Sequence, residues 1–536
     1  MRKTLAVILC ALMILPLAFV GISAAEPVAV SSAADFAAMD PAGSYKLTAD
    51  ITVDAAYGNG ETVVPFTGTF DGGGHTITLV DVPLFIKLHE ATVQNLKLAG
   101  TAKGGRDLGA LAIEGYGFTV KNVTNNANVI GPAAPTENSW IGGFVGEVYA
   151  TSGHGTAEKS CPTLFENCVN NGNVDMSHSS KDARAGGFVG NAAKYQKVTF
   201  KNCVNNGNVT YTGTKTNAYV AGIVGGCFGG EYINCTNNGK ITGGPGSSVG
   251  GLLGRGSPSS QGGDQSETFT GCVNNGDISG DSGNVGGMFG HIAEPKDTTF
   301  QLIKIDQCTN TGNITGGGSN AGGLAGYVWA NNNGTDTKPY SHAEVTNSIN
   351  TGKVTAAADG TFVSQFLAYT NSIKTVIKNN IGAGETVAKD ANRDVIVGLS
   401  SADATKYTIE NNYLVKAPTN LTYASSADYA ANVIAVTAAP AGAVVAVTAE
   451  QLASGEVAYL ANQNAGSTVF YQTLGSDSAP VINKTHKTVI LDNGTYANDA
   501  AAPTPATPTG DAAVWVLVIT AVSLLGMGIA LKARKA

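Results

Sequence analysis

The sequence predicts an all-β fold, a right-handed parallel β-helix, and three observations support this prediction. Glycine accounts for 69 of the 536 residues, whereas proline is scarce at 18 and charged residues make up only 13%, a composition typical of a chain with many tight turns. A motif recurs along the middle of the chain at a nearly constant interval. Within each copy, apolar and polar residues alternate with the period of a strand and not that of a helix.

The first recurring motif is typified by residues 165–174, which read Phe-Glu-Asn-Cys-Val-Asn-Asn-Gly-Asn-Val. The cysteines of five successive copies are 35, 32, 37 and 36 residues apart. A fixed period with insertions confined to the gaps is typical of a solenoid, in which each repeat forms one coil. The other copies lie at 200–209, 232–241, 269–278, 305–314 and 345–354, with a degenerate copy at 120–129.

A second motif, Gly-Gly-Φ-Φ-Gly with two apolar residues at its centre, lies between the copies of the first, as at 142–146 and 186–190. Together the two motifs supply several short strands per repeat, each bounded by Gly or Asn, which predicts one coil of a parallel β-helix. Equivalent residues of neighbouring coils would then stack in columns about 4.8 Å apart. The glycine pairs fit corners that need a positive φ or a close approach of two backbones.

Two columns of stacked side chains follow from this arrangement. The first Asn of each Asn doublet would form an amide ladder, with each side chain bonded to the next. The cysteines would form an inward column of reduced thiols, because parallel Cβ atoms about 4.8 Å apart exceed the roughly 3.5–4.5 Å of a disulfide. The pairing of Cys161 and Cys227 is left open. The ladder residues are Asn170, Asn205, Asn237, Asn274 and Asn310, and the cysteine column is Cys168, Cys203, Cys235, Cys272 and Cys308.

Both ends of the chain carry targeting signals. Basic residues, an apolar run and a small-residue exit predict a signal peptide at 1–25, cut after Ala25. Residues 512–531 form an apolar stretch long enough to span a bilayer as a transmembrane helix. The basic tail at 532–536 would then lie in the cytoplasm.

The residues before that stretch resemble the cell-wall sorting signal of Gram-positive surface proteins, which a sortase cuts between Thr and Gly. Thr509-Gly510-Asp511 is followed here by the apolar stretch and the basic tail, as in that family. Ala506 and Thr507 stand where the family has Leu and Pro. The resemblance implies an exported cell-surface protein, anchored to the cell wall or held by the membrane helix itself.

The repeats resemble the GLUG motif of bacterial surface proteins, in which Gly-Leu/Phe-x-Gly recurs with this period. Residues 66–77, Phe-Thr-Gly-Thr-Phe-Asp-Gly-Gly-Gly-His-Thr-Ile, look like the opening coils of the same proteins. The resemblance implies a β-helix over 45–415, preceded by a cap at 26–44 with a short amphipathic helix at 32–39. It implies no particular activity, because such repeats occur in proteins of differing function.

A small module is predicted at 416–497. Thr448-Ala-Glu-Gln451 has the pattern of a capping box and predicts a helix that runs to about Asn462. The module resembles a tail unit of repeat-bearing gut-bacterial surface proteins that has no assigned activity. An Ala/Pro/Thr-rich spacer follows at 498–511.

The sequence shows no spacing typical of a catalytic or metal site. It has no Cys-x-x-Cys or Cys/His zinc pattern, and His89-Glu90 lacks the second His of His-Glu-x-x-His. Nucleic acid is excluded as a partner because 40 acidic residues outnumber 32 basic ones. We therefore expect a non-catalytic surface adhesion protein without cofactor or metal, which binds the cell wall or membrane at its C-terminus and a glycan or host surface protein elsewhere.

The alternative is a polysaccharide lyase or glycoside hydrolase, since β-helices often host such sites. These enzymes need two carboxylates, or a carboxylate and a basic group, within about 5–10 Å on one face. Acids such as Asp277 and Asp306 occur singly at varied offsets. Aromatic residues near the repeat motifs are candidates for stacking against sugars, although half-buried sheet positions also explain them. The three singled out are Trp140, Tyr327 and Trp329.

Overall fold

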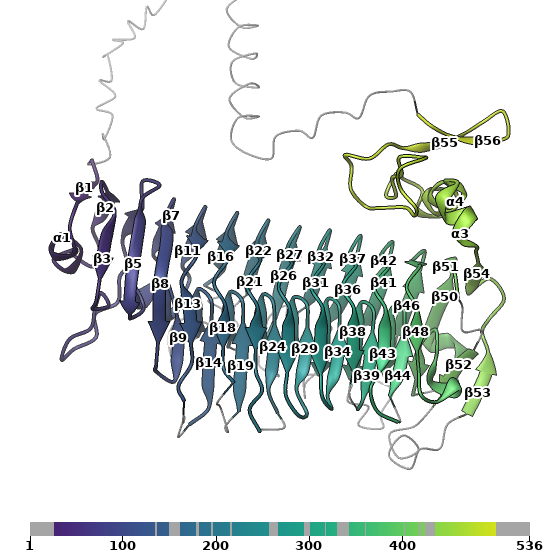
Figure 1. Ribbon diagram of the computed structural model, residues 1–536, viewed down its shortest axis with the longest axis horizontal. Helices are drawn as coiled ribbons and strands as arrows, with labels where there is room; N and C mark the ends of the chain where they lie inside the picture. The colour runs from purple at the N-terminus through teal and green to yellow at the C-terminus, as the bar shows by residue number, and fades with distance from the viewer. Residues whose placement is uncertain are drawn as a thin grey trace, which may run out of the picture.

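The chain winds into a long β-solenoid whose parallel strands stack coil upon coil (Figure 1). This confirms the expectation of a mostly β chain with parallel sheets in register. Among the residues that this computed structural model describes, no helix is long and apolar enough to cross a membrane. The predicted cleavage site at Ala25, the residues Thr509 and Gly510 and the apolar stretch at 512–531 lie outside the described residues. The described residues are 26–133, 137–149, 161–177, 182–193, 197–214, 217–256, 266–293, 301–316, 318–329, 342–359, 361–372, 374–400, 403–416, 420–423 and 435–499.

Four walls, named sheets A to D, surround the interior. Sheet A has 13 strands, which at about 4.8 Å per coil extend over roughly 58 Å. Its strands are β1 (Val28–Val30), β2 (Ser44–Leu47), β4 (Thr69–Asp71), β7 (Thr92–Gln94), β11 (Thr119–Lys121), β16 (Thr163–Glu166), β21 (Val198–Lys201), β26 (Gly230–Ile233), β31 (Glu267–Thr270), β36 (Leu302–Asp306), β41 (His342–Thr346), β46 (Lys374–Lys378) and β50 (Tyr407–Glu410).

Sheet B follows sheet A within each coil and is made mostly of two-residue and three-residue strands. Its longest strands lie near the N-terminal end. The strands of sheet B are β3 (Ile51–Val53), β5 (Thr76–Asp81), β8 (Lys97–Lys103), β12 (Thr124–Asn125), β13 (Asn128–Ile130), β17 (Val169–Asn170), β18 (Val174–Asp175), β22 (Val204–Asn205), β23 (Val209–Thr210), β27 (Thr236–Asn237), β28 (Ile241–Gly243), β32 (Val273–Asn274), β33 (Ile278–Gly280), β37 (Thr309–Asn310), β38 (Ile314–Gly316), β42 (Ile349–Asn350), β43 (Val354–Ala356), β47 (Ile381–Gly382), β48 (Thr386–Val387), β51 (Asn412–Leu414) and β54 (Val444–Ala446).

Sheets D and C complete each coil, in that order along the chain. Sheet D contains β9 (Asp107–Gly109), β14 (Ser139–Gly142), β19 (Ala183–Gly186), β24 (Tyr219–Ala221), β29 (Ser248–Gly250), β34 (Asn284–Gly286), β39 (Asn320–Gly322) and β44 (Phe362–Ser364). Sheet C contains β6 (Phe85–His89), β10 (Ala112–Tyr116), β15 (Val145–Val148), β20 (Val189–Ala192), β25 (Val224–Cys227), β30 (Leu253–Gly256), β35 (Phe289–Ala293), β40 (Ala325–Trp329), β45 (Leu367–Thr370), β49 (Gly398–Leu399), β52 (Asn420–Tyr423) and the antiparallel β53 (Ala435–Ala438).

A cap closes the N-terminal end of the core. Helix α1 (Ala33–Ala37) begins after Ser32, whose hydroxyl accepts a hydrogen bond from the backbone N–H of Asp35 at 3.1 Å. Phe36 is buried and packs edge-on against Tyr57 and Phe85, with ring centroids 5.9 and 5.6 Å apart. The first strand of sheet A, β1, pairs in parallel with β2, so the stacking of strands already begins inside the cap.

Asparagine side chains form a continuous hydrogen-bonded ladder inside the solenoid. Asn170 Nδ2 donates to Asn205 Oδ1 at 2.8 Å and to the carbonyl oxygen of Gly172 at 2.8 Å. Because each amide is satisfied by the next coil and by its own turn, the buried polar groups do not carry a desolvation penalty. The linked and fully buried amides are Asn125, Asn170, Asn205, Asn237, Asn274, Asn310 and Asn350.

The cysteines of the first motif lie in the apolar core as free thiols. Sγ of Cys203 is 3.4 Å from the carbonyl oxygen of Phe165 in the preceding coil, a weak hydrogen bond. Cys227 is also a free thiol. The five that are fully buried in successive coils are Cys168, Cys203, Cys235, Cys272 and Cys308.

The φ angles and backbone contacts at the corners of the coil show why the second motif contains paired glycines. In the described residues the paired glycines of the second motif do not adopt positive φ; instead Asn167 and Asn202, which precede the cysteines, have φ of 54° and 53°. Asparagine tolerates this left-handed conformation better than most residues. Of the two expected reasons for the glycine pairs, a positive φ or a close backbone approach, the close approach applies, since a Cβ on Gly187 would lie 2.1 Å from the carbonyl oxygen of Gly222.

A small module follows the last coils. Parallel pairing continues to β54, which pairs with β51. Thr448 and Gln451 form the predicted capping box at the start of α3 (Ala449–Ala453). The expected single helix is broken at Gly455, whose φ is 90°, and α4 (Glu456–Ala465) follows. The remaining elements are the hairpin β55 (Val489–Asp492) and β56 (Thr495–Asn498) and the 3-10 turns η1 (Ala391–Arg393) and η2 (Ala404–Lys406).

Candidate functional site: the corner between sheets C and D

The chain turns sharply from sheet D into sheet C at every Gly-Gly-Φ-Φ-Gly motif. A Cβ on Gly190, the last glycine of its motif, would lie 2.4 Å from the backbone N of Ile141. Such a close approach leaves no room for a side chain, so glycine is required. The two strands therefore lie close together, and their outward side chains meet across what we call the C–D corner. Its residues are Trp140, Arg184 and Tyr219 on sheet D, and Glu114, Glu147, Asn191, Gly226, Arg255, His291 and Tyr327 on sheet C.

Aromatic rings and guanidinium groups alternate along this corner. Trp140, Arg184 and Tyr219 occupy equivalent register positions on three neighbouring strands. The Arg184 Cζ lies 4.5 Å from the Trp140 ring centroid and 5.1 Å from that of Tyr219. The Arg255 Cζ lies 5.0 Å from the Tyr219 ring centroid. Since each cation–π contact contributes about 0.5–2 kcal/mol, the stack holds both guanidinium groups in place.

Hydrogen bonds connect the stack to sheet C. Nη1 of Arg184 donates to Asn191 Oδ1, and Asn191 Nδ2 donates to Glu147 Oε1 at 2.7 Å. Burial lowers the pKa of Arg184. Burial likewise raises the pKa of Glu147 to about 7, against the opposing hydrogen bond from Asn191. Near neutral pH the Glu147 carboxyl group can therefore both release and accept a proton.

A second carboxyl group lies beside Glu147. Glu114 on β10 is directly opposite Glu147 on β15 in the parallel register. On its other side Glu114 is opposite Lys87, whose Nζ is 2.5 Å from Glu114 Oε1. Two glutamates on adjacent coils, one of them in an ion pair, thus lie close to the Trp140 end of the stack.

The corner continues toward the C-terminal coils with a stacked His–Tyr pair. The rings of His291 and Tyr327 have centroids 5.0 Å apart at an interplanar angle of 9°. Burial lowers the pKa of His291 to about 3, so its imidazole is neutral. Nε2 of His291 and Nε of Arg255 are buried and have no hydrogen-bond partner among the described residues.

The three aromatic residues singled out from the sequence lie along this side of the solenoid without forming one site. Trp140 is stacked in the corner, while Trp329 follows Tyr327 on β40 and is 42% exposed. In sheet D, β14 of the Trp140 coil and β39 of the Tyr327 coil are five strands apart, which corresponds to roughly 24 Å. A ligand that contacts all three would have to be extended.

The sequence alone does not single out Glu114, Glu147, Arg184 or Arg255, although a signal for most of the corner is present. The positions that flank the Gly-Gly-Φ-Φ-Gly motif vary among charged, polar and aromatic residues, whereas core positions stay apolar. One column consists of the residue after the last glycine of each motif. It reads Glu147, Asn191, Gly226, Arg255, His291 and Tyr327.

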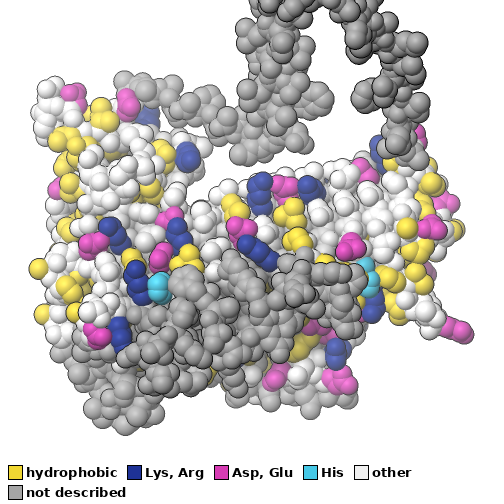
Figure 2. Space-filling view, turned by 180° about the vertical axis from the view of Figure 1, so that it is seen from behind, with side chains coloured by type: hydrophobic (Ala, Val, Ile, Leu, Met, Phe, Trp, Pro, Cys, Tyr) yellow, Lys and Arg dark blue, Asp and Glu magenta, His cyan; other side chains and the backbone are white. Residues whose placement is uncertain are grey.

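Acids outside the corner serve contacts between coils. Asp306 on β36 accepts hydrogen bonds from Thr346 Oγ1 at 2.8 Å and Asn347 Nδ2 at 2.9 Å. Asp277 accepts one from the backbone N–H of Asn313 at 2.9 Å. On the face seen in Figure 2, basic and acidic side chains are interspersed. These acids stay apart from one another and do not form the carboxylate pair that a glycosidase needs.

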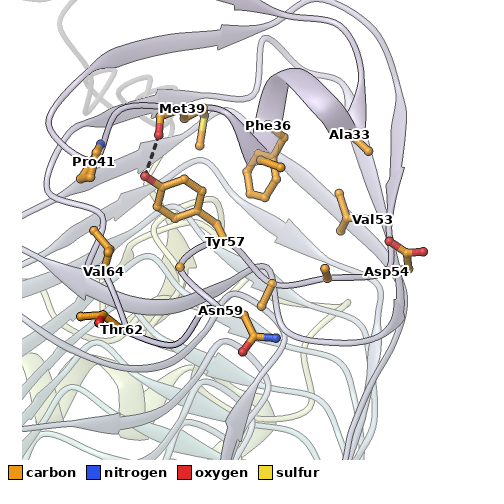
Figure 3. A pocket seen from close by; sticks show the side chains of 15 residues that line it. Ala33, Phe36, Met39, Pro41, Val53, Asp54, Tyr57, Asn59, Thr62 and Val64 are labelled. Carbon is orange, nitrogen blue, oxygen red and sulfur yellow. Dashed lines mark hydrogen bonds between the residues drawn. The ribbon is translucent and has the colours of Figure 1, made fainter.

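A cavity of about 460 Å³ lies at the N-terminal cap (Figure 3). It is bounded by α1 and by the chain at 54–64. The hydroxyl of Tyr57 reaches across it and donates to the carbonyl oxygen of Met39 at 2.9 Å. Asp54 is the one carboxylate among the residues that line it. The cavity thus lacks the convergent polar groups of the C–D corner, which makes the corner the stronger candidate site.

The fold and the corner define the chain as a parallel β-solenoid repeat protein. No family model matches its sequence. A stretch of 150 residues, 23% of the chain, is 32% identical to part of halomucin from Haloquadratum walsbyi, of which it covers 2%. The structure can be superposed on a Bacteroides ovatus protein described as a candidate immunoglobulin A1 protease, with a TM-score of 0.27, 14% identity and coverage of 86% of this chain and 93% of that one. These likenesses assign no activity to the chain.

Proposed function

We propose that the protein is a glycan-binding adhesion protein of the cell surface that does not turn over its ligand. The observation that carries this proposal is the alternating stack of Trp140, Arg184, Tyr219 and Arg255 on the C–D corner. Aromatic faces pack against the apolar faces of sugar rings, and guanidinium and amide groups bond to sugar oxygens. Because the corner repeats from coil to coil, it presents an extended surface of the kind that solenoids use for extended partners.

Binding to immobilised glycans tests this role. The exported chain should be retained on at least one polysaccharide of an array, and Trp140→Ala and Trp329→Ala should each weaken retention by about 1–3 kcal/mol. Tyr471→Ala, in the C-terminal module and away from the corner, is the matched control and should change nothing. Loss of retention in the control, or unchanged retention in both tryptophan variants, would count against the proposal.

Attachment at the cell surface is the second part of the proposal. The signal peptide at 1–25, the sorting-like Thr509-Gly510 and the resemblance to GLUG-motif surface proteins support it. The resemblance also supports a right-handed coil, and the apolar stretch at 512–531 with its basic tail supports a membrane helix. Digestion of cell walls with a muramidase separates two modes of attachment. Release of the protein with peptidoglycan fragments indicates sortase cleavage after Thr509, whereas retention with the membrane indicates anchoring through the helix.

A second candidate function is hydrolysis of a glycosidic bond, which the pairing of Glu114 with Glu147 favours. Neighbouring strands are about 4.8 Å apart, close to the roughly 5–5.5 Å between the carboxyl groups of retaining glycosidases. Glu147 would protonate the leaving oxygen while Glu114 attacks the anomeric carbon; a water molecule deprotonated by Glu147 would then break the bond between the sugar and Glu114. Release of reducing sugar by the wild-type chain, abolished in Glu147→Gln, would establish this function; retention of a glycan without such release would exclude it for that glycan.

A further inference from the structure

Gly226 interrupts the column of large side chains on sheet C at the centre of the corner. It lies between Asn191 on β20 and Arg255 on β30 in the parallel register. The side chain of Arg184 occupies the space that this glycine leaves, since a Cβ on Gly226 would be 2.9 Å from Arg184 Cδ and 3.3 Å from its Nη1. Arg184 therefore reaches from sheet D to the position on sheet C that is paired with Arg255 in the register.

The two guanidinium groups share one aromatic ring and repel each other. Both Cζ atoms are near the Tyr219 ring centroid, at 5.1 and 5.0 Å, and the charge of Arg255 contributes to the lowered pKa of Arg184. The repulsion between these two like charges costs free energy, which a nearby anion would offset. Their joint placement therefore favours a negatively charged ligand group.

Among the described residues, carboxylates lie near Arg184, whereas Arg255 forms no ion pair. Arg184 interacts electrostatically with Glu147 and Asp182. Arg255 donates through Nη1 to the neutral hydroxyl of Tyr219, while its Nε is buried without a hydrogen-bond partner among the described residues. A buried donor left unsatisfied costs about 1–3 kcal/mol, more when it is charged. An acceptor oxygen from a ligand at this point would remove that cost.

An aromatic ring flanks the same point. Phe228 follows the end of β25, two residues after Gly226, and its half-buried ring centroid lies 5.9 Å from the Arg184 Cζ. A sugar ring packed against Phe228 would place a substituent beside the two guanidinium groups. The arrangement combines a stacking surface with a doubly cationic corner.

We propose that Arg184 and Arg255 form an anion subsite above Gly226 that recognises the charged group of an acidic glycan, a uronate carboxylate or a sulfate ester. This inference rests on the proposed glycan-binding function and specifies its ligand class. Guanidinium groups suit both anions because their N–H groups form paired hydrogen bonds with carboxylate and sulfate oxygens. Neutral glycans would contact the aromatic rings but would leave the arginines uncompensated.

Affinity electrophoresis of the exported chain tests the subsite, with polygalacturonate, chondroitin sulfate and neutral galactan as separate additives. We expect at least tenfold tighter retention by one acidic polymer than by galactan, weakened by added salt. Which acidic polymer retains the chain distinguishes carboxylate from sulfate recognition. Arg255→Gln should reduce acidic retention at least tenfold and leave galactan retention unchanged. Lys201→Gln, which removes a positive charge on sheet A, is the matched control.

A second variant keeps the test decisive if Arg255→Gln fails to fold. Gly226→Asp places a carboxylate of the chain itself between the two arginines, and Gly226 does not need a positive φ. The added Cβ, 2.9 Å from Arg184 Cδ, would displace this flexible side chain, so the variant should stay folded, as thermal unfolding can check, while it loses acidic retention. Galactan retention equal to acidic retention, unaffected by both variants, would overturn the subsite and leave the glycan-binding function intact. Failure of every polymer to retain the wild-type chain would instead contradict the proposed function.

Discussion

The outer face of sheet A and the C–D corner belong to the same coils but carry different chemistry. On sheet A, Lys121 and Lys201 flank Glu166 across three coils, with N–O distances of 3.4 and 2.8 Å, and all three side chains reach solvent. Such exposed pairs stabilise a fold by about 0–1 kcal/mol. At the corner, the charged groups are partly buried among rings, and some polar atoms have no partner among the described residues. The comparison shows that the charges of sheet A are compensated within the wall, whereas at the corner Arg255 keeps a buried N–H group without a partner among the described residues.

The largest expected effect concerns the turn that creates the corner. Gly190→Ala should destabilise the solenoid by about 3 kcal/mol or more, because the added methyl group would clash with the backbone of Ile141 and neither chain can move freely. Chemical denaturation measures the loss. Gly60→Ala is the control, since a Cβ there would find its nearest neighbour 3.7 Å away. Equal stability of both variants would mean that the close approach at the corner is not tight.

A buried carboxyl group on the inner side of sheet A should make stability depend on pH. Glu267 is fully buried, and burial raises its pKa to about 8, above its ordinary value of 4.5. The folded state then binds a proton that the unfolded state releases, so stability from this group is full below pH 4.5 and is lost as the pH rises toward 8. We expect a decline of a few kcal/mol over this interval, measured by denaturation at a series of pH values. Glu267→Gln should flatten the curve; an unchanged decline in that variant would assign it to other groups.

The asparagine doublet allows a matched comparison between the inside and the outside of one coil. Asn205→Ala should cost about 2–3 kcal/mol, since it breaks the bonds to Asn237 and Gly207 and takes one of its acceptors from the buried amide of Asn170. Asn206→Ala removes an exposed bond to Asn171 and should cost less than about 0.5 kcal/mol. Thermal unfolding of the two variants checks the difference, and equal losses would contradict the importance of the inner ladder.

The smallest effect is expected on the outer face of sheet A. Lys201→Ala should lower stability by less than about 1 kcal/mol, because Lys201 is largely exposed even though its ion pair lowers the pKa of Glu166. The small loss should shrink further in high salt. Denaturation at two salt concentrations measures it. A loss of several kcal/mol that persists in high salt would show that this ion pair stabilises the fold more than an exposed pair should.

The repeat period predicts the stacked parallel coils, because a motif that returns at intervals of 32 to 37 residues with strand alternation has few other ways to bury its apolar face. The sequence left open whether the glycine pairs serve a positive φ or a close backbone approach; in the structure the close approach applies, and Asn167 and its equivalents adopt the positive φ. The alternation pattern does not reveal that choice, since both residue types tolerate the conformation.

The corner was harder to predict than the coil. Arg184 and Arg255 come from different sheets and from coils that are 71 positions apart in the sequence. Their meeting depends on how sharply the glycine motif folds sheet D onto sheet C, and that angle follows from backbone contacts at Gly190 and its equivalents. Single acids were therefore expected to stay apart, and the opposition of Glu114 to Glu147 became visible only in the register of β10 and β15.

A crystal structure of the protein with a glycan that it retains is the most direct test of the central claim, that the C–D corner is the binding surface. The account predicts sugar rings against Trp140 or Phe228, with an oxygen of the ligand within hydrogen-bond distance of Arg184 or Arg255. A glycan bound on the outer face of sheet A, or in the cavity beside Tyr57, with the corner unchanged, would contradict the account.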